Sequence, residues 1–175
     1  KSALNQLIIA SFIFYIIWIN VDNIFSIMPN GEIYKQGIWV VLFIGLAKII
    51  DSAAGINALI VGYSNMYKFT LIFILLLFGI AYSMNTILIP VFGITGSAIA
   101  TVISIFTYNL TLSLTLWFRY HIQPFTSKIF FVFLIFSVLI ALDYLIPFIR
   151  NAYLDRIIRS SIISIVFFIL LLKLR

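Results

Sequence analysis

The sequence predicts an all-α integral membrane protein, a bundle of six transmembrane helices. Of its 175 residues, 64% are hydrophobic and only 9% are charged, and the mean hydropathy is +1.22. A soluble domain is about half apolar and a quarter charged, so this composition cannot supply a water-soluble surface. The apolar runs are continuous and do not alternate with polar residues. They therefore favour helices, which leave no backbone polar group unpaired in lipid.

Six apolar segments are long enough to cross a bilayer, whose hydrocarbon core of about 30 Å needs roughly 20 helical residues. The predicted spans cover residues 6–27, 37–63, 69–89, 93–118, 129–149 and 157–172. Turn-forming and helix-breaking residues separate them, at 29–31, 64–65, Pro90 with Gly93, Pro124 and Asn151. The chain starts without Met and without a signal-peptide pattern. We therefore expect a single membrane domain, the C-terminal part of a longer chain.

Charges near the span ends predict the topology. Asp22 and Asn23 near the end of the first span, and Asp143 near the end of the fifth, are interpreted as hydrated helix ends. Counting Lys and Arg only, the side that holds both termini carries 6 against 4 on the other side. The positive-inside rule then predicts cytoplasmic termini.

The second span carries Lys48 and Asp51 at its centre, where an ionised side chain costs about 2.5–3.5 kcal/mol. Their spacing allows an intrahelical ion pair. On a continuous helix one third of the circumference would hold Gly45, Lys48, Asp51, Ser52, Gly55 and Gly62. This face should point toward other helices or a hydrated cavity. The pair is either structural or cavity-lining, in contact with substrate or a coupling ion. The second reading is favoured because pairing only partly offsets desolvation.

The third and fourth spans form a predicted tight antiparallel pair, because Pro90 and Gly93 favour a sharp turn between them. In the third span, Tyr82 and Asn85 either line a polar path or bond to a neighbouring helix.

A strip of small and hydroxylic residues runs along the fourth span within about 80° of one another. It contains Gly93, Ser97, Ala100, Ser104, Tyr108, Thr111 and Thr115, and Gly96 with Ala100 adds a small-xxx-small pair. Such residues permit close helix contact and interhelical hydrogen bonds. Two readings stay open. The strip is a helix-packing seam, with Gly93, Gly96, Ser97, Ala100 and Ser104 at its centre, or its part from Tyr108 to Thr115 lines a cavity.

The residue content predicts no catalysis. The chain has no Cys, and its single histidine, His121, lies in a basic loop without a partner motif. We expect no enzyme, no cofactor and no metal site. The net charge of +6 comes from basic residues scattered singly along the chain. Such residues set membrane topology, so we expect no nucleic-acid partner.

Three stretches in order resemble the C-terminal half of the polysaccharide biosynthesis transporters, the O-antigen and capsule flippases of the multidrug/oligosaccharidyl-lipid/polysaccharide exporter superfamily. They read PNGEIYKQG from Pro29, LAKIIDSAAGINALIVGYSNMYKF from Leu46, and LIPVFGITGSAIATVIS from Leu88. The third, followed by Asn109, is the most diagnostic. Val91 departs from the pattern, because family members often have a basic residue there.

The resemblance implies a transporter of about fourteen helices, of which this chain would be the last six, with the missing N-terminal half as its partner. Such proteins move polyprenyl-diphosphate-linked oligosaccharide from the inner to the outer leaflet of the bacterial cytoplasmic membrane by alternating access. Their cavities are cationic. Lys48 is therefore the first candidate for the diphosphate, and Arg119 is a candidate inner-face contact.

Two alternatives stay open. A cation-coupled multidrug exporter of the same superfamily would use Asp51 for ion binding. A non-transporting membrane assembly module would use Lys48 and Asp51 as a structural pair, and the strip as an oligomerisation seam.

Overall fold

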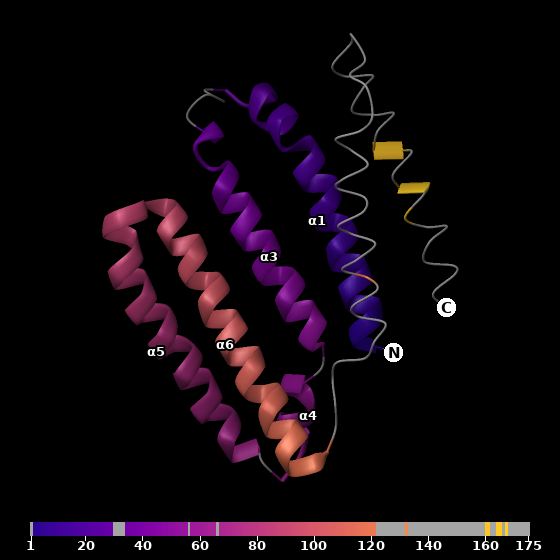
Figure 1. The fold of residues 1–175 in the computed structure, drawn as a ribbon, viewed down its shortest axis with the longest axis vertical. Helices are drawn as coiled ribbons and strands as arrows, with labels where there is room; N and C mark the ends of the chain where they lie inside the picture. The colour runs from indigo at the N-terminus through magenta and orange to yellow at the C-terminus, as the bar shows by residue number, and fades with distance from the viewer. Residues whose placement is uncertain are drawn as a thin grey trace.

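A computed structural model describes residues 2–29, 34–55, 57–65 and 67–121, together with positions 132, 160, 161, 164, 165 and 167. These segments contain the helices α1 (Ser2–Ile27), α3 (Ile38–Ala54), α4 (Asn57–Tyr63), α5 (Tyr67–Phe92) and α6 (Ile94–Tyr120) (Figure 1). The all-α prediction is confirmed for this part of the chain. Apart from the single positions, the predicted fifth and sixth spans lie outside the described residues, and so does Asp143.

Three described helices are long and apolar enough to cross a membrane, over Ala3–Asp22, Tyr67–Phe92 and Ile94–Arg119. The fourth candidate is the pair of α3 and α4, which is bent by 48° at a short break. The 17 residues of α3 reach only about 26 Å at the helical rise of 1.5 Å per residue. Since the hydrocarbon core is about 30 Å thick, α3 needs α4 to complete a crossing.

The helices lie side by side in the order α5, α6, α3, α1 (Figure 1). Neighbours in sequence are antiparallel in two pairs, α1 with α3 and α5 with α6, whereas α3 and α6 run in the same direction. The short α4 packs against both α5 and α6. The centre of the layer is therefore the contact between α3 and α6, which are not consecutive in the chain.

Two apolar clusters hold the layer together. The first joins α1 and α3 with the single described positions 132 and 167, through Leu7, Phe14, Tyr15, Ile19, Ile49, Ala53, Val132 and Phe167. The second joins α4, α5 and α6 through Val61, Phe73, Leu112 and Leu116. Gly45 brings α1 close to α3, because a Cβ atom at this position would collide with the Phe14 ring.

The α5–α6 pair confirms the predicted tight antiparallel turn. Gly93 alone separates the two helices, with a φ of +59° that favours glycine. A Cβ atom on Gly96 would collide with the carbonyl oxygen of Leu88, so the backbones touch here. The predicted end of the third span at residue 89 is too early, because α5 includes Pro90 and continues to Phe92.

The second predicted span is interrupted and is not one continuous helix. Gly55 has a φ of +63°, and its N–H donates to the carbonyl oxygens of Asp51 at 3.2 Å and Ser52 at 3.1 Å. These bonds end α3 before α4 begins in a new direction. The predicted polar face that includes both Lys48 and Gly62 requires a straight helix. This prediction is wrong, because α3 and α4 are bent by 48° relative to each other.

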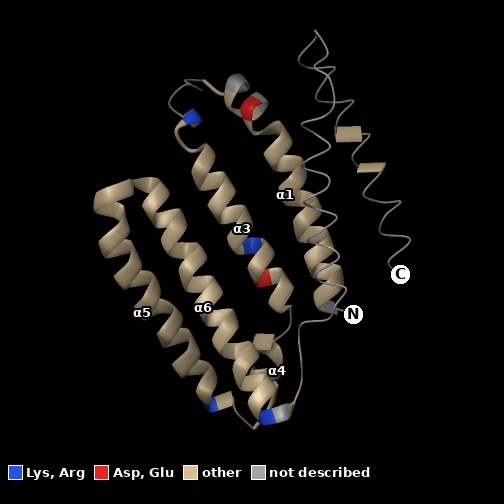
Figure 2. Cartoon of the chain, in the orientation of Figure 1, with Lys and Arg blue, Asp and Glu red and all other residues tan. Residues whose placement is uncertain are grey.

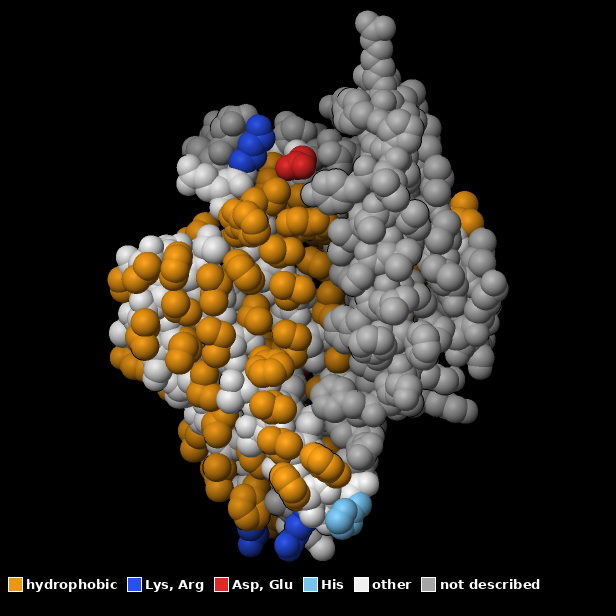
Figure 3. Space-filling view, viewed as in Figure 1, with side chains coloured by type: hydrophobic (Ala, Val, Ile, Leu, Met, Phe, Trp, Pro, Cys, Tyr) orange, Lys and Arg blue, Asp and Glu red, His pale blue; other side chains and the backbone are white. Residues whose placement is uncertain are grey.

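The surface agrees with a membrane location. Large apolar side chains cover the visible face of the described helices (Figure 3). Phe73 is the one buried residue of α5. Charged side chains in the described part of the chain lie at the helix ends, except for Lys48 and Asp51 midway along the α3–α4 segment (Figure 2).

Candidate functional site at the interrupted segment

Lys48 and Asp51 lie close to the midpoint of the segment formed by α3 and α4, which runs from Ile38 to Tyr63. Both side chains are exposed. In a bilayer this depth is the middle of the hydrocarbon, where ionised side chains mark a pathway or a site facing other helices or water. Lys48 and Asp51 therefore lie at a depth where their charges need contact with water or with another helix.

Asp51 is bound by α6 and not by Lys48. The Nδ2 atom of Asn109 donates to Oδ1 of Asp51 at 3.1 Å, and Asn109 is only 8% exposed. Within the described residues Lys48 forms no ion pair, so the expected intrahelical pair with Asp51 is wrong for this structure. The physical reason is tertiary, because α6 supplies an amide donor to the carboxylate.

A second interhelical bond lies on the other side of the break. Nδ2 of Asn57 donates to Oγ of Ser113 at 3.0 Å, and these side chains are 3% and 5% exposed. Ser113 is one helical turn beyond Asn109 on α6. The two bonds therefore tie both halves of the interrupted segment to the same helix.

Sequence reasoning missed both members of the Asn57–Ser113 pair. The available signal for Asn57 was an amide in an apolar segment, two residues after Gly55. Nothing local indicated its partner, which is 56 residues away in the chain.

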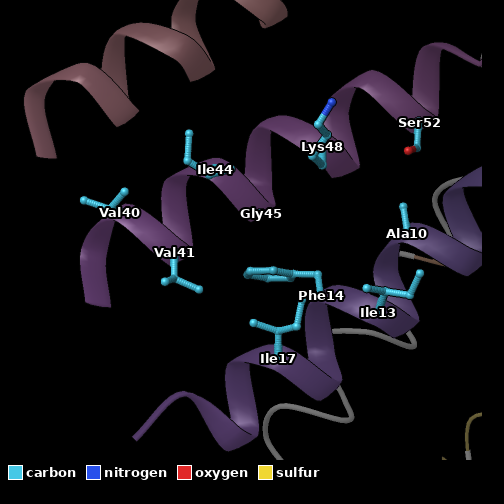
Figure 4. Close-up of a pocket in the computed structure, with 10 residues that line it drawn as sticks. All are labelled: Ala10, Ile13, Phe14, Ile17, Val40, Val41, Ile44, Gly45, Lys48 and Ser52. Carbon is cyan, nitrogen blue, oxygen red and sulfur yellow. The ribbon is translucent and has the colours of Figure 1, made fainter. Parts of the chain in front are cut away.

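A groove of about 510 Å³ lies between α1 and α3 (Figure 4). Its lining is apolar except for Lys48 and Ser52, and consists of Ala10, Ile13, Phe14, Ile17, Val40, Val41, Ile44, Gly45, Lys48 and Ser52. The nitrogen of Lys48 is directed away from Phe14 and Ile17. The groove therefore has a long apolar wall, and the Lys48 nitrogen lies on the far side of that wall. An amphiphile suits this arrangement if its chain lies in the groove and its anionic group lies beyond it.

Two predicted polar residues of α5 lie apart from this groove, because α6 separates α5 from α3. Tyr82 and Asn85 line a shallow hollow of about 290 Å³ on α5. Nδ2 of Asn85 donates to the Ala81 carbonyl at 2.8 Å, whereas its Oδ1 is buried without a partner in the described structure. Asn85 on α5 therefore does not belong to the same site as Lys48 on α3.

In the part of the chain that the structure describes, the hydroxyl groups of Ser104, Thr111 and Thr115 in the strip donate hydrogen bonds within α6 and not to another helix. The hydroxyl of Ser104 donates to the carbonyl of its own helix one turn earlier, at 2.7 Å. The same pattern holds for Thr101, Thr107, Thr111 and Thr115. Asn109 and Ser113 form the polar links instead.

The predicted packing residues of the strip differ in burial. Gly96, Ala100 and Ser104 are buried, Ser97 is partly buried, and Gly93 is exposed at the turn. Tyr108 is partly buried and packs against the cluster of Leu112 and its neighbours. Close contact is therefore concentrated in the part of α6 near the turn.

Arg119 is exposed near the end of α6. It lines a hollow of about 460 Å³ with Thr111, Leu114, Thr115 and Phe118. Ten residues of helix place it about 15 Å from Asn109 along the axis. Arg119 is therefore not part of the mid-depth site around Lys48 and Asp51.

No protein-family model matches this chain, and comparisons with curated proteins and with solved structures also give no match. The length and composition of the described helices define the class of a multi-pass α-helical membrane protein. Among the described residues, no group of three or more His, Cys, Asp or Glu side chains could hold a metal ion.

Proposed function

We propose that this chain is part of a transporter that moves polyprenyl-diphosphate-linked oligosaccharide from the inner to the outer leaflet of a bacterial cytoplasmic membrane by alternating access. The observation that carries the proposal is Lys48, which forms no ion pair within the described residues and lies at mid-depth of an interrupted segment, beside an apolar groove. Interrupted membrane helices commonly form transport sites. The ordered motifs that resemble the flippase family supply the substrate class.

The proposed substrate has two chemically different parts that match this groove. A diphosphate needs cations, and lysine binds phosphate as a point charge. A polyprenyl chain needs an apolar wall, which Phe14, Ile17 and Val41 provide. Lys48 has no ion-pair partner among the described residues, which leaves its charge available for the diphosphate.

The other candidates have secondary roles in this proposal. Ser52 adds a hydroxyl to the groove, and Arg119 meets the diphosphate at the inner end of the path. Asn85 and Tyr108 remain candidates for a cavity completed by the N-terminal half. The proposal assigns no chemical step and no cofactor to this chain.

The test is complementation of a flippase-deficient strain by the full-length protein that contains this segment. Lys48→Ala is expected to lower surface polysaccharide by roughly thirty-fold or more, because truncating one partner of a charged contact that substrate binding desolvates costs about 2–5 kcal/mol. Lys48→Arg should keep part of the activity, since it keeps the charge.

Lys35→Ala is the matched control, because Lys35 is an exposed lysine at a helix end and does not line the groove. Protein levels in the membrane are measured for each variant. Normal polysaccharide from a well-expressed Lys48→Ala variant, or from the double variant Lys48→Leu with Asp51→Leu, refutes the role of this site.

One observation favours a cation-coupled exporter as the second candidate. The Asp51 carboxylate lies at mid-depth, is exposed and accepts a hydrogen bond from Asn109. In that case Asp51→Asn abolishes drug efflux driven by an ion gradient. Surface polysaccharide is then independent of the protein.

A further inference from the structure

Two cationic side chains lie at the end of the α5–α6 pair that is opposite to the Gly93 turn. Lys68 is the second residue of α5, and Arg119 is the second-last residue of α6. Because the two helices are adjacent and antiparallel, both cations lie at the same end of the layer (Figure 2). Both side chains are exposed, and neither forms an ion pair within the described residues. The exposed His121 follows directly after α6. We call this surface the basic end. It consists of Lys68, Arg119, His121 and the aromatic residues Tyr63, Tyr67, Trp117 and Phe118.

The helix lengths place this end at the level of the lipid headgroups. The 26 residues of α5 and the 27 residues of α6 each span about 40 Å, which exceeds the hydrocarbon core of about 30 Å. Lys68 and Arg119 lie about 17 Å from the midpoints of their helices. Half of the hydrocarbon thickness is about 15 Å, so both cations lie just outside it.

Aromatic side chains surround the two cations. Tyr63 is 90% exposed, Phe118 74% and Trp117 47%. The rings of Trp117 and Phe118 stack with centroids 5.5 Å apart, and Nζ of Lys68 lies 6.0 Å from the ring centroid of Tyr67. Exposed aromatic residues at this depth are typical of the membrane interface.

The charge of the basic end is not balanced by the described protein. The described acidic residues are Asp22, near the opposite end of the layer, and Asp51 at mid-depth. The turn end of the same helix pair, residues 86–97, has no charged residue at all. The pair is therefore cationic at one end only, and its complement is an anion at headgroup depth.

The hollow beside Arg119 extends this surface toward the hydrocarbon. Arg119 lies at its headgroup end, Leu114 and Phe118 supply apolar walls, and Thr111 lies two helical turns deeper. Arginine binds phosphate oxygens through a planar fork, and lysine adds a point charge. An acyl chain beneath the phosphate fits the apolar wall.

We propose that the basic end binds the headgroup of an anionic phospholipid of the surrounding bilayer, with Arg119 on the phosphate, Lys68 beside it and an acyl chain along Leu114 and Phe118. Arg119 is also the inner-face contact of the transport proposal, so the two proposals are distinguished by what each experiment measures. Failure of the lipid proposal would show in a lipid-binding assay, whereas failure of the transport proposal would show in complementation.

The test measures lipid preference at Trp117 with the full chain in phosphatidylcholine vesicles. Trp18→Phe and Trp39→Phe leave Trp117 as the only tryptophan of the three. Brominated phosphatidylglycerol and brominated phosphatidylcholine then quench its fluorescence in proportion to their occupancy. We expect a preference of roughly 25-fold for phosphatidylglycerol, because each of the two cations contributes about 1 kcal/mol, or about five-fold. Lys68→Gln with Arg119→Gln should remove it, at roughly five-fold per charge.

Lys35→Gln is the matched control, and the preference should remain. Lys35 shortly precedes α3, whose start lies at the end of the layer opposite to the start of α5 (Figure 1). Arg119→Lys should keep most of the preference for phosphatidylglycerol. That result would show that the preference depends on the positive charge and not on a change in the folding of α6. Equal quenching by the two lipids in the parent protein overturns the proposal. So does an unchanged preference in the double variant, or an equal loss in Lys35→Gln.

Discussion

Within the described residues, amide side chains and not ion pairs make the polar links between α3, α4 and α6. Asn109 reaches Asp51, and Asn57 reaches Ser113. The threonine hydroxyls of α6 bond within their own helix, so they are satisfied before any neighbour arrives. The hydroxylic strip therefore packs through the shape of its side chains. The polar contacts between the helices come from the two amides, Asn109 and Asn57.

The Asn57–Ser113 bond is testable by a double-mutant cycle with Asn57→Ala and Ser113→Ala. We expect a coupling of about 0.6 kcal/mol and at most about 1.7 kcal/mol, the range for hydrogen bonds between membrane helices. The measurement is equilibrium unfolding in mixed micelles with increasing SDS.

A cycle between Asn57→Ala and Thr111→Ala is the control, because the Thr111 hydroxyl bonds to its own helix. Its coupling should be close to zero. A coupling of zero for Asn57 with Ser113 as well would mean that this bond does not contribute to the association of α4 with α6.

The antiparallel α5–α6 pair could be predicted in large part from single residues near its turn. Pro90 and Gly93 were sufficient to predict the turn, and Gly96 the close approach. The end of α5 was harder to place, because a proline inside a helix usually kinks or ends it, whereas α5 continues for two residues beyond Pro90.

Gly96→Ala should destabilise this pair by about 1–3 kcal/mol, because the new methyl group meets the backbone of Leu88 and overpacks the contact. Gly79→Ala in α5 is the matched control, since no atom lies within 4 Å of a Cβ atom built there. It should be neutral or stabilise by up to about 1 kcal/mol, because alanine is the better helix former. Equal unfolding curves for the two variants in SDS titration would contradict the close contact.

The interruption between α3 and α4 could not be predicted from the local sequence. An isolated glycine within an apolar run is tolerated inside a helix, so Gly55 alone does not distinguish a break from a continuous span. The break depends on what surrounds it. A Cβ atom at Gly55 would lie 2.8 Å from Cα of Ala3, so α1 packs directly against this position.

At the level of the whole molecule, the connection before α3 and the connection before α5 lie at opposite ends of the layer (Figure 1). The basic end lies on the same side as the start of α5. From the positive-inside rule we predict that residue 65 and His121 lie in the cytoplasm and that residue 36 lies outside.

This topology can be measured by single-cysteine labelling, because the chain has no Cys to give a background signal. A membrane-impermeant maleimide added to intact cells should label Gln36→Cys and leave Asn65→Cys and His121→Cys unlabelled until the cells are lysed. All three positions are exposed. The reverse pattern would invert the orientation, and labelling of residues 36 and 65 from one side would show that α3 and α4 do not cross the membrane together.

The sequence by itself determined the class of this protein and the α5–α6 turn. Both follow from properties that are local or additive: the fraction of apolar residues, the length of each apolar run, and the conformations open to Pro90 and Gly93. Only the tertiary structure decided that α6 lies between α5 and α3, and that Asp51 bonds to Asn109 instead of Lys48. That bond joins residues 58 positions apart. A contact of this kind depends on which helices become neighbours, and apolar spans of similar length do not encode their neighbours in composition or periodicity.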